Sequence, residues 1–170
     1  MTYRVGNGFD VHRFSDDPAR PLVLGGVRFE GVGLEGHSDA DVVAHACAEA
    51  LLGPAGLGDL GTHFPDTDEQ WAGADSLQLL IEVVRRVAAA GWKPVNIDCA
   101  VVAERPKLAP QRAQMESLLT AAVGAPVTVA GRRAEGLGAL GRVEGIACFA
   151  TALLEPSHPQ ATLVADGELL

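Results

Sequence analysis

The stretch Gly8-Phe9-Asp10-Val11-His12 decides how this chain folds around its chemistry, because it places two metal-binding side chains on one predicted strand, residues 3–13. Side chains two residues apart on a strand point to the same face, so Asp10 and His12 lie together. His45, from a helix that follows, can join them. One aspartate and two histidines supply three ligands and leave a fourth position open, which is typical of a catalytic rather than a structural zinc site.

The helix that carries His45 begins in an acidic segment. Its predicted N-cap is Ser38 or Asp39, its first turn contains Asp41, and it runs to about Leu52, where Gly53-Pro54 is expected to stop it. An Asp-x-His pair alone is a common pattern without a metal. Three of the 5 histidines and three aspartates nevertheless fall in these two short segments, which favours a metal site over a solvated surface.

Composition limits the possible classes of protein. The 170 residues fit one domain, predicted at residues 1–155, with a flexible tail at 156–170. A net charge of −9 argues against a nucleic-acid partner, because phosphate contacts need lysine and arginine. The sequence shows neither a signal peptide nor an apolar run of membrane-spanning length. Three separated cysteines, Cys47, Cys99 and Cys148, predict reduced core residues of a cytoplasmic protein.

The remaining pattern alternates strands and helices. A hairpin arm is expected at 23–28, a helix from about Leu77 to Gly91, a strand at 95–101, a helix from Pro110 to Gly124, and a strand from Val127. Residues 146–154 are apolar, and their spacing does not distinguish a strand from a helix. This order predicts an α/β or α+β sandwich with helices on one face of the sheet. The other face would need a neighbouring subunit, so we expect a homo-oligomer.

Seven short segments follow one another along the chain: Gly8–His12, His37–Val42, Gly58–Gly61, Phe64–Asp68, Gly73–Ser76, Pro106-Lys107 and Gly141–Ala147. In this order they resemble the motifs of one enzyme family, the 2-C-methyl-D-erythritol 2,4-cyclodiphosphate synthases of the non-mevalonate isoprenoid route. The resemblance covers about residues 3–155. It implies an α+β fold (an α/β sandwich) with a mixed four-stranded main sheet, helices on one face, and a homotrimer interface on the other.

The resemblance also implies a reaction. Members of the family convert 4-diphosphocytidyl-2-C-methyl-D-erythritol 2-phosphate into the 2,4-cyclodiphosphate and release CMP, as phosphorus–oxygen lyases. The substrate's own 2-phosphate attacks the β-phosphorus, assisted by two divalent metals. No protein nucleophile is needed, which agrees with a chain that has no serine or cysteine arrangement suited to covalent catalysis. Positioning and charge neutralisation then do most of the catalysis.

The resemblance assigns roles residue by residue, in sites that lie between subunits. Asp10, His12 and His45 would hold Zn²⁺ or another divalent metal, and Glu135 would hold Mg²⁺ or Mn²⁺ with the substrate diphosphate. His37 and Arg133 would be catalytic. The substrate-binding residues would be Asp10, His12, His37, Ser38, Asp59, Leu60, Gly61, Phe64, Pro65, Asp66, Thr67, Asp68, Ala103, Pro106, Lys107, Leu108, Ala109, Arg132, Arg133, Ala134, Glu135, Ala139 and Arg142.

One segment departs from the family pattern. Arg132 and Arg133 stand where the family usually has threonines, and Ala139 stands where it has a bulkier residue. The arginines could replace the hydroxyls as bidentate phosphate donors, or they could crowd the site. Retained activity is the favoured interpretation. The alternatives are a metal-dependent phosphohydrolase, or a non-catalytic trimer that binds a nucleotide or an isoprenoid diphosphate.

Overall fold

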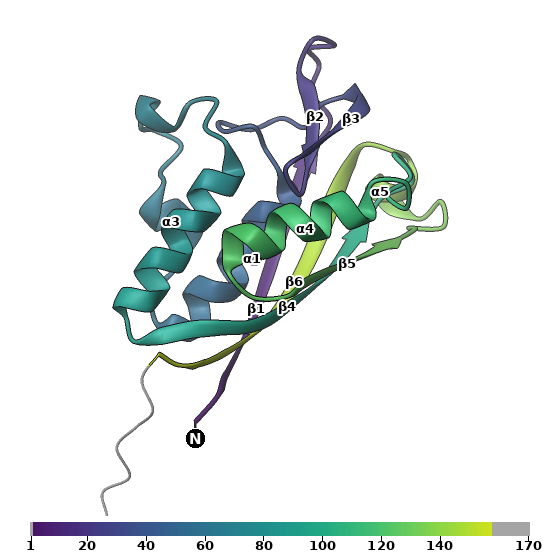
Figure 1. The fold of residues 1–170 in the computed structure, drawn as a ribbon. Helices are drawn as coiled ribbons and strands as arrows, with labels where there is room; N and C mark the ends of the chain where they lie inside the picture. Colours follow the sequence, from purple (N-terminus) through teal and green to yellow (C-terminus); the bar gives the residue numbers. More distant parts are fainter. Residues whose placement is uncertain (1, 158–170) are drawn as a thin grey trace, which may run out of the picture.

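A four-stranded sheet in the order β1–β6–β4–β5 forms one layer of the molecule (Figure 1). The computed structural model describes residues 2–157. Its strands are β1 (Arg4–Arg13), β2 (Pro21–Leu24), β3 (Val27–Val32), β4 (Trp92–Val102), β5 (Val127–Arg132) and β6 (Gly145–Pro156). β1 and β4 both pair antiparallel to β6, whereas β4 and β5 are parallel, so the sheet is mixed as predicted. β2 and β3 form a separate hairpin.

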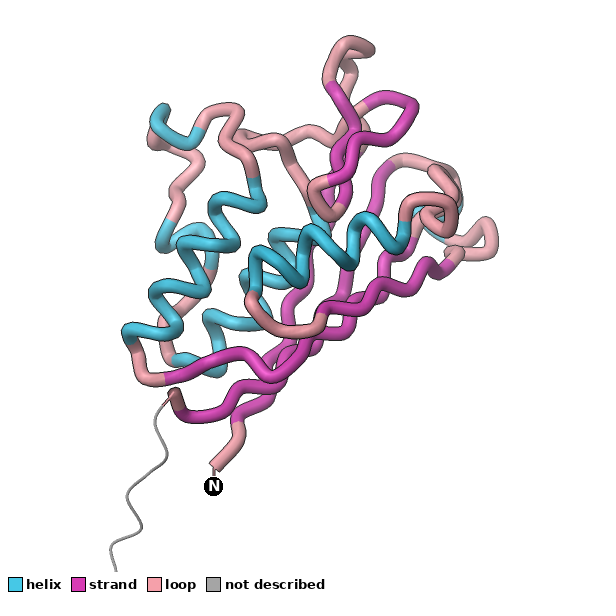
Figure 2. Tube along the Cα trace, viewed as in Figure 1, coloured by secondary structure: helices cyan, strands magenta, loops and turns pink. Residues whose placement is uncertain are grey.

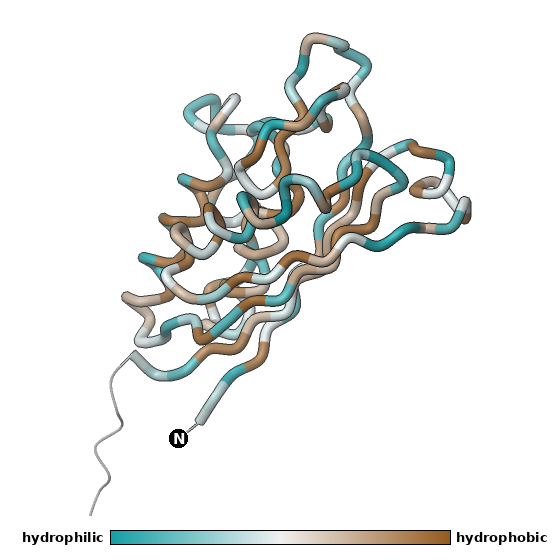
Figure 3. Tube along the Cα trace, turned by 45° about the vertical axis from the view of Figure 1, so that its right-hand side comes forward, coloured by the Kyte–Doolittle hydropathy of each residue, from teal (hydrophilic) through white to brown (hydrophobic). Residues whose placement is uncertain are grey.

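The helices cover one face of this sheet, and Figure 2 shows the helical and strand layers separately. They are α1 (Val42–Ala55), α2 (Leu60–His63), the 3₁₀ helix η1 (Glu69–Trp71), α3 (Ser76–Ala89), α4 (Arg112–Val123) and α5 (Gly138–Gly141). α1 packs on β1 and β6, α4 packs on β5, and α3 contacts both helices. Hydrophobic residues recur along the strands and the three long helices (Figure 3). The predicted α+β class with helices on one face is confirmed.

The ambiguous segment at 146–154 is a strand. β6 pairs along its length with β1 on one side and β4 on the other. This pairing with neighbouring strands makes the segment a strand, a choice that its residue spacing alone could not settle. Pro156 is the last residue of β6, and the Ser157 N–H donates to the Gly91 carbonyl at 2.9 Å. The rest of the predicted tail, residues 158–170, lies outside the described residues.

Both predicted ends of the His45 helix were wrong. The N-cap is Asp41, whose carboxylate accepts from the N–H groups of Val43 and Ala44 and, at 2.8 and 2.7 Å, from those of Gly25 and Gly26 in the β2–β3 turn. Those long-range donors are invisible to a local capping rule. At the other end the helix continues through Pro54 and stops at Gly56, which has φ 78°.

Three short helices escaped the sequence analysis. α2, η1 and α5 each have only three or four residues, too few for a helical period to be seen. Asp59 caps α2 by accepting from the Thr62 N–H at 2.8 Å. α4 begins at Arg112 rather than Pro110, and it ends at Gly124 as expected. Within residues 2–157, no helix is long and apolar enough to cross a membrane.

Two glycines bring β1 unusually close to α1. A Cβ atom added at Gly6 would lie 2.1 Å from the Ala50 carbonyl oxygen, and one added at Gly8 would lie 1.9 Å from that of Ala46. Real Cβ atoms do not approach oxygen that closely, so any side chain at either position would push the helix away from the strand. Because side chains alternate along β1, Asp10 and His12 share this helix-facing side with the two glycines.

The opposite face of β1 and β6 exposes several large apolar side chains. Val5, Phe9, Val11 and Phe149 form an outer strip in which each residue is about half exposed or more, and the Phe9 and Phe149 rings lie 4.8 Å apart. The interior, by contrast, contains all three cysteines as buried, unpaired thiols, with the sulfurs of Cys47 and Cys99 3.4 Å apart. The prediction that the cysteines are core residues is confirmed.

Candidate active site

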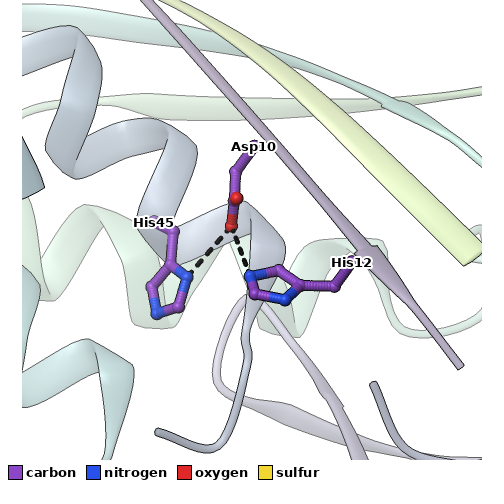
Figure 4. A group of neighbouring side chains, drawn as sticks. All are labelled: Asp10, His12 and His45. Atoms are coloured by element: carbon purple, nitrogen blue, oxygen red, sulfur yellow. Dashed lines mark hydrogen bonds and ion pairs between the residues drawn. The ribbon is translucent and has the colours of Figure 1, made fainter. Parts of the chain in front are cut away.

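Asp10, His12 and His45 converge on one point, as Figure 4 shows. Asp10 Oδ2 lies 3.0 Å from His12 Nε2 and 3.0 Å from His45 Nδ1. One ligand atom from each residue lies within 4.8 Å of the others. Asp10 and His12 come from β1 and His45 comes from α1. The close approach of this strand and helix at Gly8 sets the distance between the ligands. The predicted metal-binding group is therefore assembled in the fold.

One hydrogen bond, on the side of His12 away from Asp10, fixes which of its ring nitrogens carries a proton. His12 Nδ1 lies 2.6 Å from the backbone carbonyl of Glu35, and a carbonyl can only accept, so Nδ1 is the protonated nitrogen. In a neutral ring Nε2 then carries a lone pair and can only accept. This lone pair faces the Asp10 carboxylate, which is also an acceptor.

A serine orients His45 so that, as in His12, the protonated ring nitrogen points away from Asp10. Ser76 Oγ donates its proton to the Asp39 carboxylate, so it accepts from His45 Nε2–H at 2.9 Å, and Ser38 Oγ lies 3.2 Å from the same nitrogen. The lone pair of His45 Nδ1 therefore also faces Asp10. Two imidazole lone pairs and a carboxylate are stable together only with a proton or a cation between them. The donor set and its supporting hydrogen bonds fit a divalent metal.

The pKa values of the metal-free cluster follow from the same contacts. Burial by itself would raise the pKa of Asp10, but hydrogen bonds with His12 and His45 outweigh burial and hold this pKa well below its usual value. Burial would likewise lower the pKa of His12, whereas its hydrogen bond to Asp10 raises the net pKa above the usual value. Without a metal, a proton on the His12 imidazole takes the place of the cation.

A cavity of about 420 Å³ opens beside the cluster. Its lining residues are His12, Gly36, His37, Ser38, His45, Leu60, Gly61, Phe64, Pro65, Asp66, Trp71 and Leu79. Nine of these were predicted as site residues, and we call this space the metal cavity. Asp59, Thr67 and Asp68 do not line it: Asp59 caps α2, and Asp68 caps η1 while its carbonyl lies 2.9 Å from His37 Nε2.

A second cavity of about 540 Å³ lies where β4 and β5 end, and it shares no lining residue with the metal cavity. We call it the loop cavity. It brings together the predicted residues Ala103, Pro106, Lys107, Leu108, Ala109, Arg132 and Arg133 with Val101, Glu104, Arg112 and Gly131. Arg133 is paired with Glu104, and this pair lowers the pKa of the Glu104 carboxyl.

Besides Asp10, Asp59, Thr67 and Asp68, four more predicted site residues line neither of these two cavities: Ala134, Glu135, Ala139 and Arg142. Glu135 has a left-handed backbone with φ 52°, and within residues 2–157 it belongs to no group of three metal-binding side chains. Arg142 pairs with Glu144 at 2.7 Å. One chain thus carries two separate sets of site residues, and Glu135 would need further ligands from outside the chain to hold an ion.

Several supporting residues were missed by the sequence analysis. Arg20 donates to the carbonyls of Gly36 and Ser38 at 2.8 and 2.5 Å, on either side of His37. Ser76 lies beyond the acidic loop in sequence, and Trp71 packs edge-on against Phe64 in the cavity wall at 4.9 Å. The Gly73–Ser76 motif was the only signal for Ser76, and nothing local indicated Arg20 or Trp71.

The chain belongs to the YgbB family, whose sequence pattern matches residues 3–155. It is 52% identical over 158 residues to the 2-C-methyl-D-erythritol 2,4-cyclodiphosphate synthase of Synechococcus sp. (strain CC9311), covering 89% of this chain and 94% of that protein. It is 54% identical over 153 residues to the bifunctional enzyme IspD/IspF of Anaeromyxobacter dehalogenans (strain 2CP-C), covering 88% of this chain but only 39% of that relative. A solved 2-C-methyl-D-erythritol-2,4-cyclodiphosphate synthase with CDP bound matches with a TM-score of 0.80 and 36% identity, over 89% of this chain and 100% of that one.

Proposed function

We propose that this chain converts 4-diphosphocytidyl-2-C-methyl-D-erythritol 2-phosphate into 2-C-methyl-D-erythritol 2,4-cyclodiphosphate and CMP. The observation that carries the proposal is the metal cavity, where two imidazole lone pairs and a carboxylate converge beside His37. The named relatives favour this cyclisation over the phosphohydrolase and the non-catalytic binding protein.

In this reaction the substrate supplies its own nucleophile. An oxygen of the 2-phosphate forms a bond to the β-phosphorus, the bond from the β-phosphorus to the bridging oxygen breaks, and CMP leaves with that oxygen. When bound, Zn²⁺ at Asp10, His12 and His45, and Mg²⁺ or Mn²⁺ at Glu135, would neutralise charge on the phosphate oxygens. The work left to the protein is positioning and the exclusion of water.

The residues of the metal cavity suit these two tasks. The His37 ring is tied to the Asp68 carbonyl, and Arg20 holds the backbone on both sides of it, so this imidazole has a fixed place beside the metal ligands. Phe64, Trp71 and Leu79 form an apolar wall of the same cavity. We infer that His37 contacts the reacting phosphates and that this wall keeps bulk water away from the β-phosphorus.

We further propose that the protein is a cytoplasmic homotrimer in which the loop cavity of one subunit completes the metal cavity of the next. Three features support this assembly: the two cavities share no residue, the outer strip exposes large apolar side chains, and a structural neighbour carries CDP. In this arrangement Ala103 and residues 106–109 would hold the cytidine, and Glu135 would meet the diphosphate.

Phosphorus NMR of the authentic substrate tests the proposed reaction. Protein loaded with Zn²⁺ and supplied with Mg²⁺ should give resonances of CMP and the cyclic diphosphate, and His37→Gln should slow their appearance without removing bound zinc. An open diphosphate or free phosphate would indicate the phosphohydrolase instead. Binding of CDP without any product would indicate the non-catalytic alternative. Sedimentation at several concentrations tests the trimer independently.

A further inference from the structure

Glu104 and Arg133 meet because two parallel strands end together. Val102 of β4 is the register partner of Arg132 in β5, and the Ala103 N–H donates to the Arg132 carbonyl at 2.9 Å. The chain therefore leaves both strands at the same edge of the sheet. Glu104 and Arg133 follow within two residues of that point, and both line the loop cavity.

The Glu104 carboxylate accepts hydrogen bonds from both ends of the turn at residues 133–136, which follows β5. Its Oε2 accepts from Arg133 Nε at 3.0 Å and from Nη2 at 2.7 Å, and its Oε1 accepts from the Gly136 N–H at 3.2 Å. The side chain of Glu104 is only 10% exposed. These bonds span Glu135, which has the left-handed φ of 52° that costs energy in a residue with a Cβ atom. Glu104 and Arg133 together thus fix the backbone conformation of Glu135.

Arg132, the residue just before Arg133, has no carboxylate partner of this kind in the described part of the chain. Its guanidinium donates to the adjacent Gly131 carbonyl at 3.1 Å, and within residues 2–157 it forms no ion pair. It lines the loop cavity together with Lys107. A guanidinium with its charge uncompensated is a strong donor to phosphate oxygens, whereas one paired with a carboxylate has its charge compensated and some of its N–H donors already in use.

We infer that Arg132 and Arg133 have different roles because Glu104 pairs with only one of them. Arg133, bound to Glu104, is a positioning residue that fixes the Glu135 turn, and Arg132 is the residue that binds a phosphate of a nucleoside diphosphate in the loop cavity. This assignment rests on the proposed function for the class of ligand. It also moves Arg133 from the catalytic role that the family resemblance implies to a supporting one.

The test compares Arg132→Gln, Arg133→Gln and Glu104→Gln in the full chain, with CDP as the probe. Calorimetry without divalent metal should show CDP affinity falling about tenfold or more in Arg132→Gln, the loss of a charge-assisted hydrogen-bond donor. Arg133→Gln and Glu104→Gln should stay within about threefold of wild type. Arg85→Gln is the matched control, because it breaks an ion pair on α3 whose arginine is similarly exposed, 69% against 68% for Arg133.

A second measurement reports on Glu135. Electron paramagnetic resonance of Mn²⁺ added to the CDP complex should show weaker Mn²⁺ binding in Arg133→Gln and in Glu104→Gln. Their double variant should be no weaker than either single one, because both remove the same contact. Equal loss of metal-free CDP affinity in Arg132→Gln and Arg133→Gln would overturn the inference, and so would unchanged Mn²⁺ binding. Failure of the wild type to bind CDP would also overturn it, whereas binding without cyclisation would overturn only the proposed function.

Discussion

The metal cavity and the loop cavity are built by different forces. The metal cavity rests on β1 and α1, which glycine–carbonyl contacts hold close together, and a network of hydrogen bonds through Ser76 orients His45. The loop cavity lies at the ends of β4 and β5 and the segments that follow them, and an ion pair between an exposed arginine and a largely buried glutamate holds part of it. Packing tolerates little change, whereas loops vary readily. The departure from the family pattern, at Arg132 and Arg133, lies accordingly in the loop cavity.

The strongest test of this contrast removes a ligand from the metal cavity. His45→Ala should abolish tight zinc binding and lower turnover by at least about a hundredfold, because metal stabilisation of a phosphoryl transition state is worth several kcal/mol. Zinc content by mass spectrometry and turnover by phosphorus NMR would measure both effects. CDP affinity without metal should remain, since the loop cavity is separate. Retention of one tightly bound zinc by this variant would contradict the assignment.

The packing beneath the ligands can be broken without touching them. Gly8→Ala places a methyl group 1.9 Å from the Ala46 carbonyl oxygen, so β1 and α1 must separate, and overpacking of this kind costs about 1–3 kcal/mol. Urea denaturation should show that loss, together with weaker zinc binding. Gly53→Ala is the control: its added Cβ meets nothing within 4 Å, and the stability should change by less than about 1 kcal/mol. A stable Gly8→Ala variant with wild-type zinc affinity would refute the packing argument.

Ser76→Ala probes the orientation of His45. It removes the nearer of two hydroxyl oxygens beside His45 Nε2–H and one of the donors to Asp39, so zinc affinity should fall about 10–100-fold. Competition with a chromogenic chelator measures the affinity. Ser117→Ala, at an exposed position of α4, should leave it unchanged. If the two serine variants bind zinc equally well, Ser76 does not support the site.

The smallest expected effect is a dependence of stability on pH in the metal-free protein. Asp10 has a lowered pKa, so its contribution is present above the usual value of 3.8 and is lost as the pH falls through the folded value. His12 has a raised pKa, so its contribution is present below 6.5 and is lost as the pH rises through the folded value. The stabilisation by this pair should therefore be greatest between about pH 4 and 6.5.

Urea denaturation in the presence of a chelator at pH 3, 5.5 and 8 would measure this window. The difference in unfolding free energy between wild type and Asp10→Asn should be largest at the middle pH. A difference that does not vary with pH would show that the pair does not carry charge in the folded protein.

Sequence reasoning found the metal ligands because their signal is local. The period of a strand places Asp10 and His12 together, and a following helix can deliver His45. The cap at Asp41 was missed because two of its donors come from Gly25 and Gly26, about sixteen residues earlier. Local rules therefore identify the residues that bind the metal and the kinds of element that carry them.

The supporting contacts could not be predicted because they are long-range. Ser76 reaches His45 across 31 residues, and Glu104 meets Arg133 across 29. Only the packing of α3 against α1, and the parallel pairing of β4 with β5, bring these residues together. The resemblance to a family named the segments on both sides, but it could not show that Glu104 is engaged by an arginine that the family usually lacks.

The pairing of β4 with β5 is continuous from Ile97 with Val127 to Val102 with Arg132. The number of residues in these two strands therefore matters more than which residues they contain. Deleting or inserting a single amino acid in either strand would turn every later side chain to the other side of the sheet. Glu104 and Arg133 would then leave the sheet in opposite directions, even with both residues intact. During divergence, this part of the gene should therefore accumulate exchanges of residue type while rejecting indels.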